Sequence, residues 1–583
     1  MGQETPSSKA RQPRDDSLTV TDNRTGKQYK VPITHNAIPA TAFKAIRAST
    51  GPNDRIEDET ERGLRVSDRG FLNTAVIESA ITYIDGEQGI LRYRGYPIEQ
   101  LAENSTFLEC AYLLIYGALP TRGQLAHFER EVLLHGIMHA DATEFFGAFR
   151  YDAHPMAMLT SAFAYLGSYY GEANPSLQGQ TLYTKCAKGD PEALRNMDKQ
   201  IFRLIGKATT LAAMAYRVRQ GREFVVPPTG MSYTESFLYQ LDHLSPTDSF
   251  SASSSASSSP SPYKPHPVLA RALDILFILH ADHEMNASST TVLQTGSSLP
   301  DPYSAVAAGG PLHGGANEAV IRMLVAIGSP ENVPAYLAAV KRREKVLSGF
   351  GHRVYKTSDP RSFIIRKIAD EVFAVTGPDP LLDTAMALHD AALKDEYFVS
   401  RKLGPNVDFW SGLIYRAMGI SQTLSTVGQG VLRVTLCLGF PMDFFPVLFV
   451  VPRVVGWVAH WRQMMLSPEG VKIWRPKQIY VGPSERPYAS LDERKTVGGS
   501  GKEPSEIVHS GMAKRRRLAE IGSLGTGSEG MGLVAHPGCA NSTHILSKGA
   551  AGTVYSPQSA VSINELRNWA FTGKLVKGES LHR

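Results

Sequence analysis

The sequence predicts a mainly α-helical protein with a small β hairpin near its N-terminus. From Ile98 to about Trp461, apolar residues recur at steps of three and four, the period of a helix with one buried face. Between Leu18 and Ile33, alternating apolar and polar residues surround the turn-forming letters DNRTGK, which is typical of two antiparallel strands. Neither βαβ alternation nor a solenoid repeat is present, so parallel-sheet and repeat folds are not expected.

Shorter signals place individual elements. The letters ITYIDGEQGILRYRG predict a second strand–turn–strand, with Asp85 and Gly86 in the turn. The helix that begins near Ile98 is expected to stop by Gly117, and a later, longer helix by Gly221, because glycine commonly ends a helix.

Composition marks the boundaries between segments. Residues 17–97 form a β-containing segment, and the helical region follows at 98–490. Residues 1–16 are polar and the tail 491–583 is rich in Gly and Ser, so both are expected to be disordered. A loop of almost pure Ser, Pro and Ala at 245–262 interrupts the helical region.

Bulk composition excludes several functional classes. The chain has 583 residues, 42% of them hydrophobic, and a formal net charge of only +5, which gives no reason to expect a nucleic-acid partner. Its four cysteines are scattered without CxxC spacing, so neither a zinc site nor a disulfide framework is expected. The most apolar stretch, 434–451, is too short and too interrupted by proline to span a membrane. No secretory or transit signal is recognised, so the cytoplasm is the expected compartment.

Two segments place histidines beside helix ends. LHADHEMNASST holds His280, His283 and Glu284, but their order does not match the HExxH zinc motif, so no metal is expected and a polar helix end is the simpler alternative. GGPLHGGANEAV places His313 on a glycine-rich turn that opens a helix. The positive helix end favours a neutral imidazole there, which can donate a hydrogen bond to a carbonyl oxygen. The alternative is a histidine that only caps the helix.

A third segment, GFGHRVYKTSDPRS, holds His352, Lys356 and Arg361. This combination suits a dianionic substrate, because arginine binds a carboxylate through two parallel hydrogen bonds. The letters DPR alone are equally typical of a turn and a helix start.

Three further residues are candidates. Asp408, in PNVDFWSG, is either a functional carboxylate or simply the N-cap of the next helix. Arg453 lies among apolar residues in VVPRVVGW and therefore needs an anionic partner, from the protein or from a ligand. Arg475, in IWRPKQIY, is a weaker case of the same kind.

Taken together and in this order, HADHEMNAS, GPLHGGANEA, GFGHRVYKTSDPR, PNVDFWSG, VPRVVGWVAHWR and RPKQIY resemble citrate synthase. The resemblance runs from about Leu18 to Tyr488 and is strongest to the bacterial-type branch, which includes 2-methylcitrate synthases. It implies an all-α homodimer whose large and small helical domains both lie within 98–490. It also implies oxaloacetate and an acyl-CoA as substrates, without a metal, a separate cofactor or a membrane partner.

The resemblance also implies residue roles. Asp408 matches the base that deprotonates the acyl-CoA, His313 the donor to the enolate oxygen, and His352 the group that polarises the ketone. Lys356 lies where the family places a basic group near the CoA phosphates. The residues that match the oxaloacetate carboxylate binders are His283, Arg361, Arg453 and Arg475, the last contributed by the second subunit.

Two departures from the family pattern stand out. Near residues 308–311 the chain lacks about five residues, more than one helical turn, ahead of the His313 turn. Residues 420–440 are an atypical insertion that separates Asp408 from Arg453 in the sequence. We interpret the insertion and the tail as translated intron sequence.

Three functions remain open at this point. An alkylcitrate synthase of fungal secondary metabolism, using a longer acyl-CoA, is slightly favoured because the chain departs from a housekeeping sequence and shows no organellar signal. The alternatives are an ordinary citrate or 2-methylcitrate synthase, or a non-catalytic relative that binds CoA esters. The shortened approach to His313 is the main support for the last.

Overall fold

The computed structural model describes residues 16–49, 63–242, 264–309, 315–352, 354–356, 359–377, 379–418, 421–423, 435–437, 440–482, 485–488 and 490–491. The chain divides into two units, 1–484 and 485–583, and every helix and strand named below belongs to the first. His313, the Ser-rich loop at 245–262 and nearly all of the tail lie outside the described residues, so the predictions for them stay predictions.

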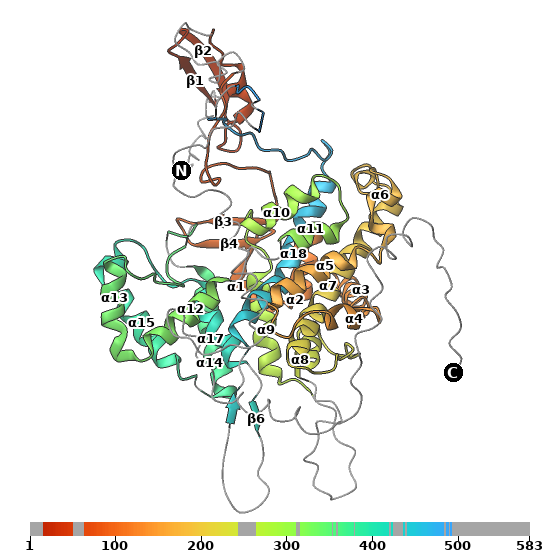
Figure 1. The fold of residues 1–583 in the computed structure, drawn as a ribbon, viewed down its shortest axis with the longest axis vertical. Helices are drawn as coiled ribbons and strands as arrows, with labels where there is room; N and C mark the ends of the chain where they lie inside the picture. Colours follow the sequence, from red (N-terminus) through yellow and green to blue (C-terminus); the bar gives the residue numbers. More distant parts are fainter. Residues whose placement is uncertain are drawn as a thin grey trace, which may run out of the picture. The chain divides into compact units, whose positions relative to one another are not determined.

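The first unit is mostly helical, with short strands, as the sequence predicts (Figure 1). The strands are β1 (Ser17–Asp22), β2 (Lys27–Pro32), β3 (Thr82–Asp85), β4 (Ile90–Tyr93), β5 (Tyr96–Pro97), β6 (Ser421–Thr423) and β7 (Thr435–Cys437). The α-helices are α1 (Ile98–Asn104), α2 (Phe107–Tyr116), α3 (Arg122–Leu134), α4 (Ala142–Gly147), α5 (Pro155–Leu166), α6 (Pro175–Gln178), α7 (Pro191–Arg219), α8 (Tyr233–Asp242), α9 (Pro267–His280), α10 (Ala287–Gly296), α11 (Pro302–Gly309), α12 (Gly315–Ile327), α13 (Val333–Lys341), α14 (Pro360–Thr376), α15 (Leu382–Lys394), α16 (Glu396–Val399), α17 (Val407–Ala417) and α18 (Phe445–Met465).

Both predicted β pieces are confirmed. Strands β1 and β2 pair antiparallel, with Ser17 opposite Pro32, and β3–β4–β5 form a second antiparallel sheet. The Asp85 carboxylate closes the β3–β4 turn by accepting hydrogen bonds from the backbone N–H groups of Glu87 and Gln88, at 3.0 and 2.9 Å. Within the insertion, β6 and β7 form a further antiparallel pair that the sequence did not predict.

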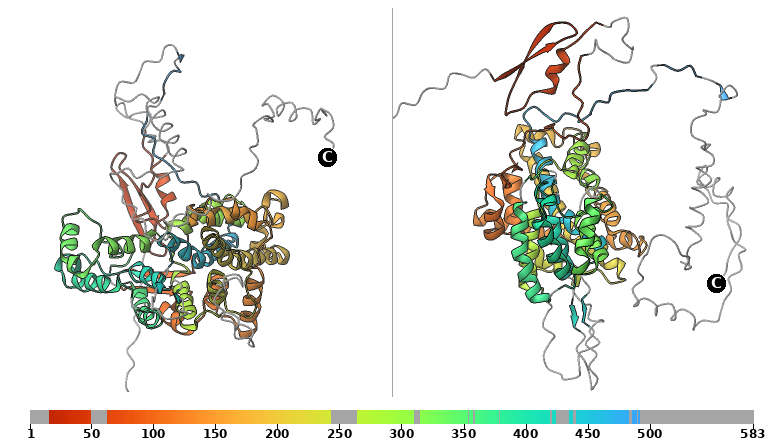
Figure 2. Two further views of the ribbon diagram at one scale, coloured as in Figure 1. Left: turned by 60° about the horizontal axis from the view of Figure 1, so that its bottom comes forward. Right: turned by 90° about the vertical axis from the view of Figure 1, so that its left-hand side faces the viewer.

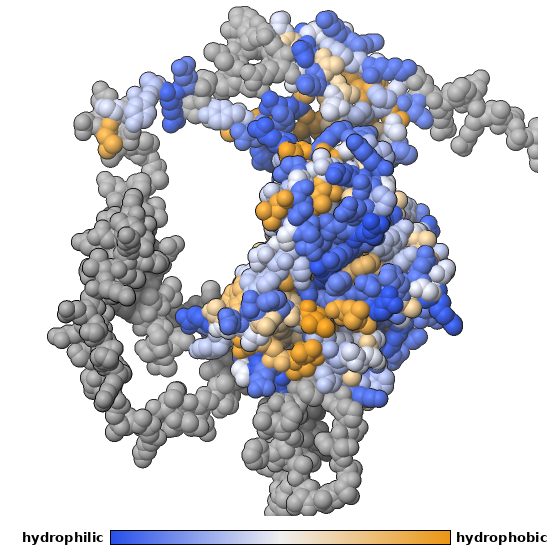
Figure 3. All heavy atoms as spheres, turned by 90° about the vertical axis from the view of Figure 1, so that its right-hand side faces the viewer, coloured by the Kyte–Doolittle hydropathy of each residue, from blue (hydrophilic) through white to orange (hydrophobic). Residues whose placement is uncertain are grey.

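Helix α18 is the central helix of the core, and α2, α7, α9 and α10 pack against it (Figures 1 and 2). The run Met442–Met465 is, in the described part of the chain, the single helix long and apolar enough to cross a membrane. Of the 18-residue window that meets this criterion, 89% is buried within the protein, as expected for a core helix that is apolar on all sides. The face drawn in Figure 3 is largely hydrophilic, with apolar side chains in small groups.

The helices on either side of the insertion at 420–440, α17 and α18, remain in contact. The ring of Tyr415, near the end of α17, lies 5.8 Å from the ring of Phe445, at the start of α18. After the insertion, Asp443 accepts hydrogen bonds from both terminal nitrogens of Arg219, at 3.1 and 2.6 Å. Because Arg219 is the last residue of α7, the resumed chain is tied to the core.

The same turn of α7 holds the chain where it enters the Ser-rich loop. Buried Arg217 donates hydrogen bonds to the backbone carbonyls of Gln240 and Leu241, at 3.2 and 3.1 Å, in the last turn of α8. The last turn of α7 therefore anchors one end of each unusual segment.

Glycine at the α3–α7 crossing provides a test of this packing. A Cβ atom at Gly206, in α7, would lie 2.1 Å from the carbonyl oxygen of Val132, so backbone must move. We expect Gly206→Ala to lower the free energy of unfolding by about 1–3 kcal/mol. Gly123→Ala, in α3, is the matched control: its Cβ meets open space, and alanine should stabilise the helix by roughly 0.5–1 kcal/mol. Thermal or urea unfolding measures both, and equal changes in the two variants would contradict the packing.

Candidate active site

The loop that carries His352 is fixed to the chain just before α17. Gly349 and Gly351 both have left-handed backbone angles, with φ of 79° and 76°, which glycine adopts without strain. The N–H of Gly351 donates to the carbonyl of Gly404 at 2.7 Å, and the N–H of Asn406 donates to the carbonyl of Gly349 at 2.9 Å. These bonds set the distance between His352 and the first turn of α17.

The backbone also selects the tautomer of His352. Its Nδ1 atom accepts hydrogen bonds from the N–H groups of Val354 and Tyr355, at 3.0 and 3.3 Å. Nδ1 is therefore unprotonated, and the proton of the neutral ring lies on Nε2. Burial, reinforced by the charge of Arg361, lowers the pKa of His352 to about 4. At neutral pH this histidine is an uncharged hydrogen-bond donor.

Arg361 is held by a buried carboxylate, that of Asp359. Asp359 accepts from the Arg361 Nε and Nη2 atoms at 3.0 and 2.8 Å, and from its backbone N–H at 3.1 Å. Burial opposes the charge of both groups, but the ion pair prevails and lowers the pKa of Asp359 while raising that of Arg361. Asp359 is the N-cap of α14 and also accepts from the N–H of Val407 at 3.3 Å, so it joins α14 to α17.

Asp408 lies in the first turn of α17, beside this ion pair. The interpretation of Asp408 as the N-cap is wrong: the N-cap is Asn406, whose side chain accepts the N–H of Asp408 at 3.0 Å. The Asp408 carboxylate is thus not committed to capping. Burial raises its pKa to about 6, although the nearby charges of Arg361 and Arg453 act in the opposite direction. A carboxylate with a pKa close to neutral is suited to accept a proton.

Arg453 is buried in α18 with an incomplete set of partners. Its Nε donates to the carbonyl of His280 at 2.7 Å, but its Nη1 atom has no hydrogen-bond partner in the described part of the chain. Burial lowers the pKa of Arg453 to about 10, and the charge of Asp282 offsets only part of this effect. A bound anion would supply the missing partner.

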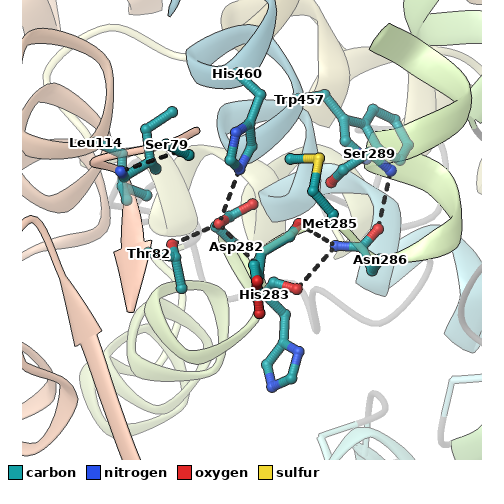
Figure 4. Close-up of polar contacts among 12 residues, drawn as sticks. Ser79, Thr82, Leu114, Asp282, His283, Met285, Asn286, Ser289, Trp457 and His460 are labelled. Atoms are coloured by element: carbon teal, nitrogen blue, oxygen red, sulfur yellow. Dashed lines mark hydrogen bonds and ion pairs between the residues drawn. The ribbon is translucent and has the colours of Figure 1, made fainter. Parts of the chain in front are cut away.

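His283 follows α9 and approaches the His352 loop. The two imidazole rings lie 5.2 Å apart, and the His283 ring lies 5.7 Å from that of Tyr355. Figure 4 shows His283 beside Asn286. The Asn286 side chain donates to the carbonyl of His283 at 3.4 Å. Across the residues that the structure describes, no group of three or more His, Cys, Asp or Glu side chains could hold a metal ion.

The predicted residues divide into those that the structure brings together and those that it does not. Lys356 is exposed, yet its charge acts on His352. Arg475 is exposed in the segment after α18, and no interaction in the described ranges connects it to the others. His313 is not described. The residues that share one cluster are His283, His352, Arg361, Asp408 and Arg453.

Sequence reasoning missed two residues that contact this cluster, Asp359 and Tyr355. Asp359 was interpreted only as part of a turn, although its position before Pro and Arg361 is the signal for an N-cap that also forms the ion pair. Tyr355 is buried, its ring lies 4.8 Å from that of His352, and its hydroxyl has no hydrogen-bond partner among the described residues. A tyrosine two residues beyond Arg353 carried no recognisable signal.

Comparisons with known proteins agree with this geometry. A family model described as "Citrate synthase, C-terminal domain" matches residues 70–435 and 432–477, two matches that meet inside the insertion. A citrate synthase of Dictyostelium discoideum is 46% identical over 86% of this chain and 89% of its own length. The glyoxysomal citrate synthase of Cucurbita maxima is 46% identical over 86% of this chain and 88% of its own length. The peroxisomal citrate synthase of Dictyostelium discoideum is 49% identical over 82% of this chain and 88% of its own length.

Solved structures show the same likeness. The citrate synthase of Pyrobaculum aerophilum superposes with a TM-score of 0.60 at 34% identity, covering 72% of this chain and 93% of that one. A ternary complex of carboxymethyl coenzyme A and oxaloacetate with citrate synthase from Thermoplasma acidophilum superposes with a TM-score of 0.59 at 28% identity, covering 72% and 98%.

The β3–β4 turn supports the His352 loop through a glycine that cannot be enlarged. A Cβ atom at Gly86 would lie 2.1 Å from the carbonyl oxygen of Val354, and the carbonyl of Gly86 accepts the N–H of Lys356 at 2.7 Å. We expect Gly86→Ala to weaken the binding of a dicarboxylate such as malonate on the order of a hundredfold, the penalty for misplacing a site group by about 1 Å. Isothermal titration calorimetry measures the Kd for malonate. Gly404→Ala, where a Cβ meets open space, is the control and should bind normally.

Proposed function

Because the chain belongs to the citrate synthase family, we propose that it is an ordinary citrate synthase, which joins acetyl-CoA to oxaloacetate and releases citrate and CoA. One observation carries the proposal beyond membership: a carboxylate with a raised pKa, Asp408, stands beside a neutral histidine donor and two buried arginines. Enzymes of this family need no cofactor, and acyl-CoA is a substrate.

The chemistry requires each of these groups. The α-hydrogen of a thioester is a very weak acid, so its removal needs a base in contact, the role of Asp408. The resulting carbon nucleophile attacks the ketone carbon of oxaloacetate, while the Nε2–H of His352 donates to the ketone oxygen as it gains negative charge. Water then cleaves the citryl thioester to citrate and CoA. His313 remains the proposed donor to the enolate oxygen, on the resemblance alone.

Oxaloacetate carries two carboxylates that need cationic or hydrogen-bonding partners. The proposed binders are Arg453, whose buried Nη1 has no hydrogen-bond partner in the described ranges, Arg361, which Asp359 holds in place, and His283. Pairing with a carboxylate would restore the electrostatic stabilisation that burial removes from Arg453. Arg475 from a second subunit and Lys356 at the CoA phosphates complete the proposal, which includes the homodimer.

The relatives favour acetyl-CoA over a longer donor. The proteins to which this chain is similar are named as citrate synthases, and none of these names indicates the alkylcitrate specialisation that the sequence alone slightly favoured. Two of those names specify peroxisomes or glyoxysomes. They favour a peroxisomal compartment for this chain over the cytoplasm expected from its sequence.

A donor panel tests the function. Purified protein should release free CoA from acetyl-CoA only when oxaloacetate is present, because the arginines need the dianion before the closed, water-poor site can form. We expect kcat/KM to be highest for acetyl-CoA and about tenfold or more lower for propionyl-CoA, since one methylene is worth about 1–3 kcal/mol. Preference for hexanoyl- or benzoyl-CoA would restore the alkylcitrate alternative, and no release with any donor would favour the non-catalytic one.

The raised pKa of Asp408 gives a pH prediction. The kcat/KM for acetyl-CoA should fall about tenfold per pH unit below about pH 6, because protonated Asp408 cannot accept a proton. His352, with its pKa near 4, stays neutral through that range and cannot cause this limb. Asp408→Asn should abolish turnover but leave oxaloacetate binding intact. A wild-type profile flat down to pH 5 would exclude Asp408 as the base.

The same shift has a consequence for stability. An unfolded aspartate titrates near pH 4, below the folded pKa, so the ionised carboxylate disfavours folding and stability is lost as pH rises from about 4 through 6. Asp408→Asn removes this cost. Its free energy of unfolding should exceed that of the wild type on the order of 1–2 kcal/mol at pH 8, allowing for partial exposure, and equal it near pH 4.

A further inference from the structure

Helix α18 contacts three consecutive residues at the end of α9 and just beyond it, His280, Ala281 and Asp282. Besides the bond from Arg453 already described, the N–H of Gly456 donates to the carbonyl of Ala281 at 3.1 Å, and His460 Nε2 lies 3.2 Å from the Asp282 carboxylate. The approach is so close that a Cβ atom at Gly456 would lie 2.4 Å from Asp282 Oδ1. Figure 4 shows His460 directed at Asp282 from α18.

Asp282 shapes the backbone around His283. Its Oδ2 atom accepts the N–H of Glu284 at 3.1 Å, which closes a turn with His283 at its centre, and Glu284 has a left-handed φ of 56°. Thr82 also donates to Oδ2, at 2.5 Å. The Tyr93 hydroxyl donates to the Asp282 carbonyl at 2.7 Å and accepts its N–H at 3.2 Å. The Asp282 carboxylate therefore holds a strained turn in place.

His460 is dedicated to this carboxylate. Both side chains are fully buried, and His460 Nδ1 has no hydrogen-bond partner in the part of the chain that the structure describes. Burial would raise the pKa of Asp282, but the His460 contact, together with the charge of Arg453 and the hydrogen bond from Thr82, outweighs it. The pKa is therefore lowered, and the carboxylate is ionised. A hydrogen bond to an ionised acceptor is among the strong ones.

We propose that His460 is a positioning residue for oxaloacetate: through Asp282 it fixes the turn that presents His283 to the substrate. The chain of contacts runs from α18 to the carboxylate, from the carboxylate to the Glu284 N–H, and so to the His283 backbone. Because Arg453 lies on the same helix, α18 sets the spacing of two oxaloacetate binders together. The inference rests on the proposed function and deepens it.

Substitutions that keep or remove the donor test the inference. His460→Leu should raise the Kd and KM for oxaloacetate about ten- to a hundredfold, by analogy with partners that orient metal-binding histidines, while the KM for acetyl-CoA changes little. His460→Gln keeps an N–H that can reach Asp282 and should recover most of the affinity. Gln463→Ala is the matched control: it lies one turn further along α18, bonds to the Glu78 carbonyl at 2.9 Å, and should leave both constants unchanged.

The outcomes are separable. A wild-type protein that binds oxaloacetate by calorimetry but releases no CoA contradicts the proposed function, and the Kd comparison still decides the role of His460. If His460→Leu lowers Tm without raising the oxaloacetate Kd, the positioning role is excluded. It is also excluded if His460→Gln binds oxaloacetate as weakly as His460→Leu does. Should His460→Leu not fold, Thr82→Val removes another donor to the same oxygen and must raise the same Kd.

Discussion

The buried ion pair between Asp359 and Arg361 is the interaction on which the site depends. The Asp359 carboxylate caps α14, pairs with Arg361 and accepts the N–H of Val407. One side chain therefore positions both a proposed substrate binder and the proposed base. Breaking such a pair by removing one partner leaves an uncompensated buried charge, at a cost of roughly 3–5 kcal/mol. Neither Asp359 nor Arg361 can therefore be replaced alone without destabilising the site.

The protein's own groups balance the positive charge of the site only in part. Arg361 is paired with Asp359, whereas one nitrogen of Arg453 has no hydrogen-bond partner among the residues that the structure describes. The charge of Asp282 offsets only part of the effect of burial on Arg453. A substrate dianion would complete the balance that the protein leaves open. The same two positive charges moderate the pKa of Asp408, which burial alone would raise further. The same two arginines are thus proposed both to bind oxaloacetate and to influence the pKa of Asp408, so the two effects are electrostatically linked.

Much of the fold was predictable because it follows from local pattern. Apolar periodicity predicted most of the helices, and the turn letters predicted both hairpins. The single helix expected from Ile98 to Gly117 is wrong: it is two helices, α1 and α2, because Thr106 caps a new start. Chemical type was enough to select His352, Arg361 and Arg453 as candidates, because a glycine turn or an arginine among apolar residues can be recognised within a single segment. The error at Asp408 arose because Asn406, two residues earlier, is an equally good cap and only geometry chooses between them. Contacts such as Gly86 with Val354, or Asp282 with His460, join residues far apart in the sequence and leave no local signal.

The last turn of α7 has an evolutionary consequence. It holds the chain before one unusual segment and after the other, so growth at either place leaves the helices beside it in contact. The entropy of closing a loop rises only slowly with its length. New coding sequence can therefore accumulate at these two points with little effect on the catalytic scaffold. For the same reason they are the natural places to graft a reporter domain into this enzyme.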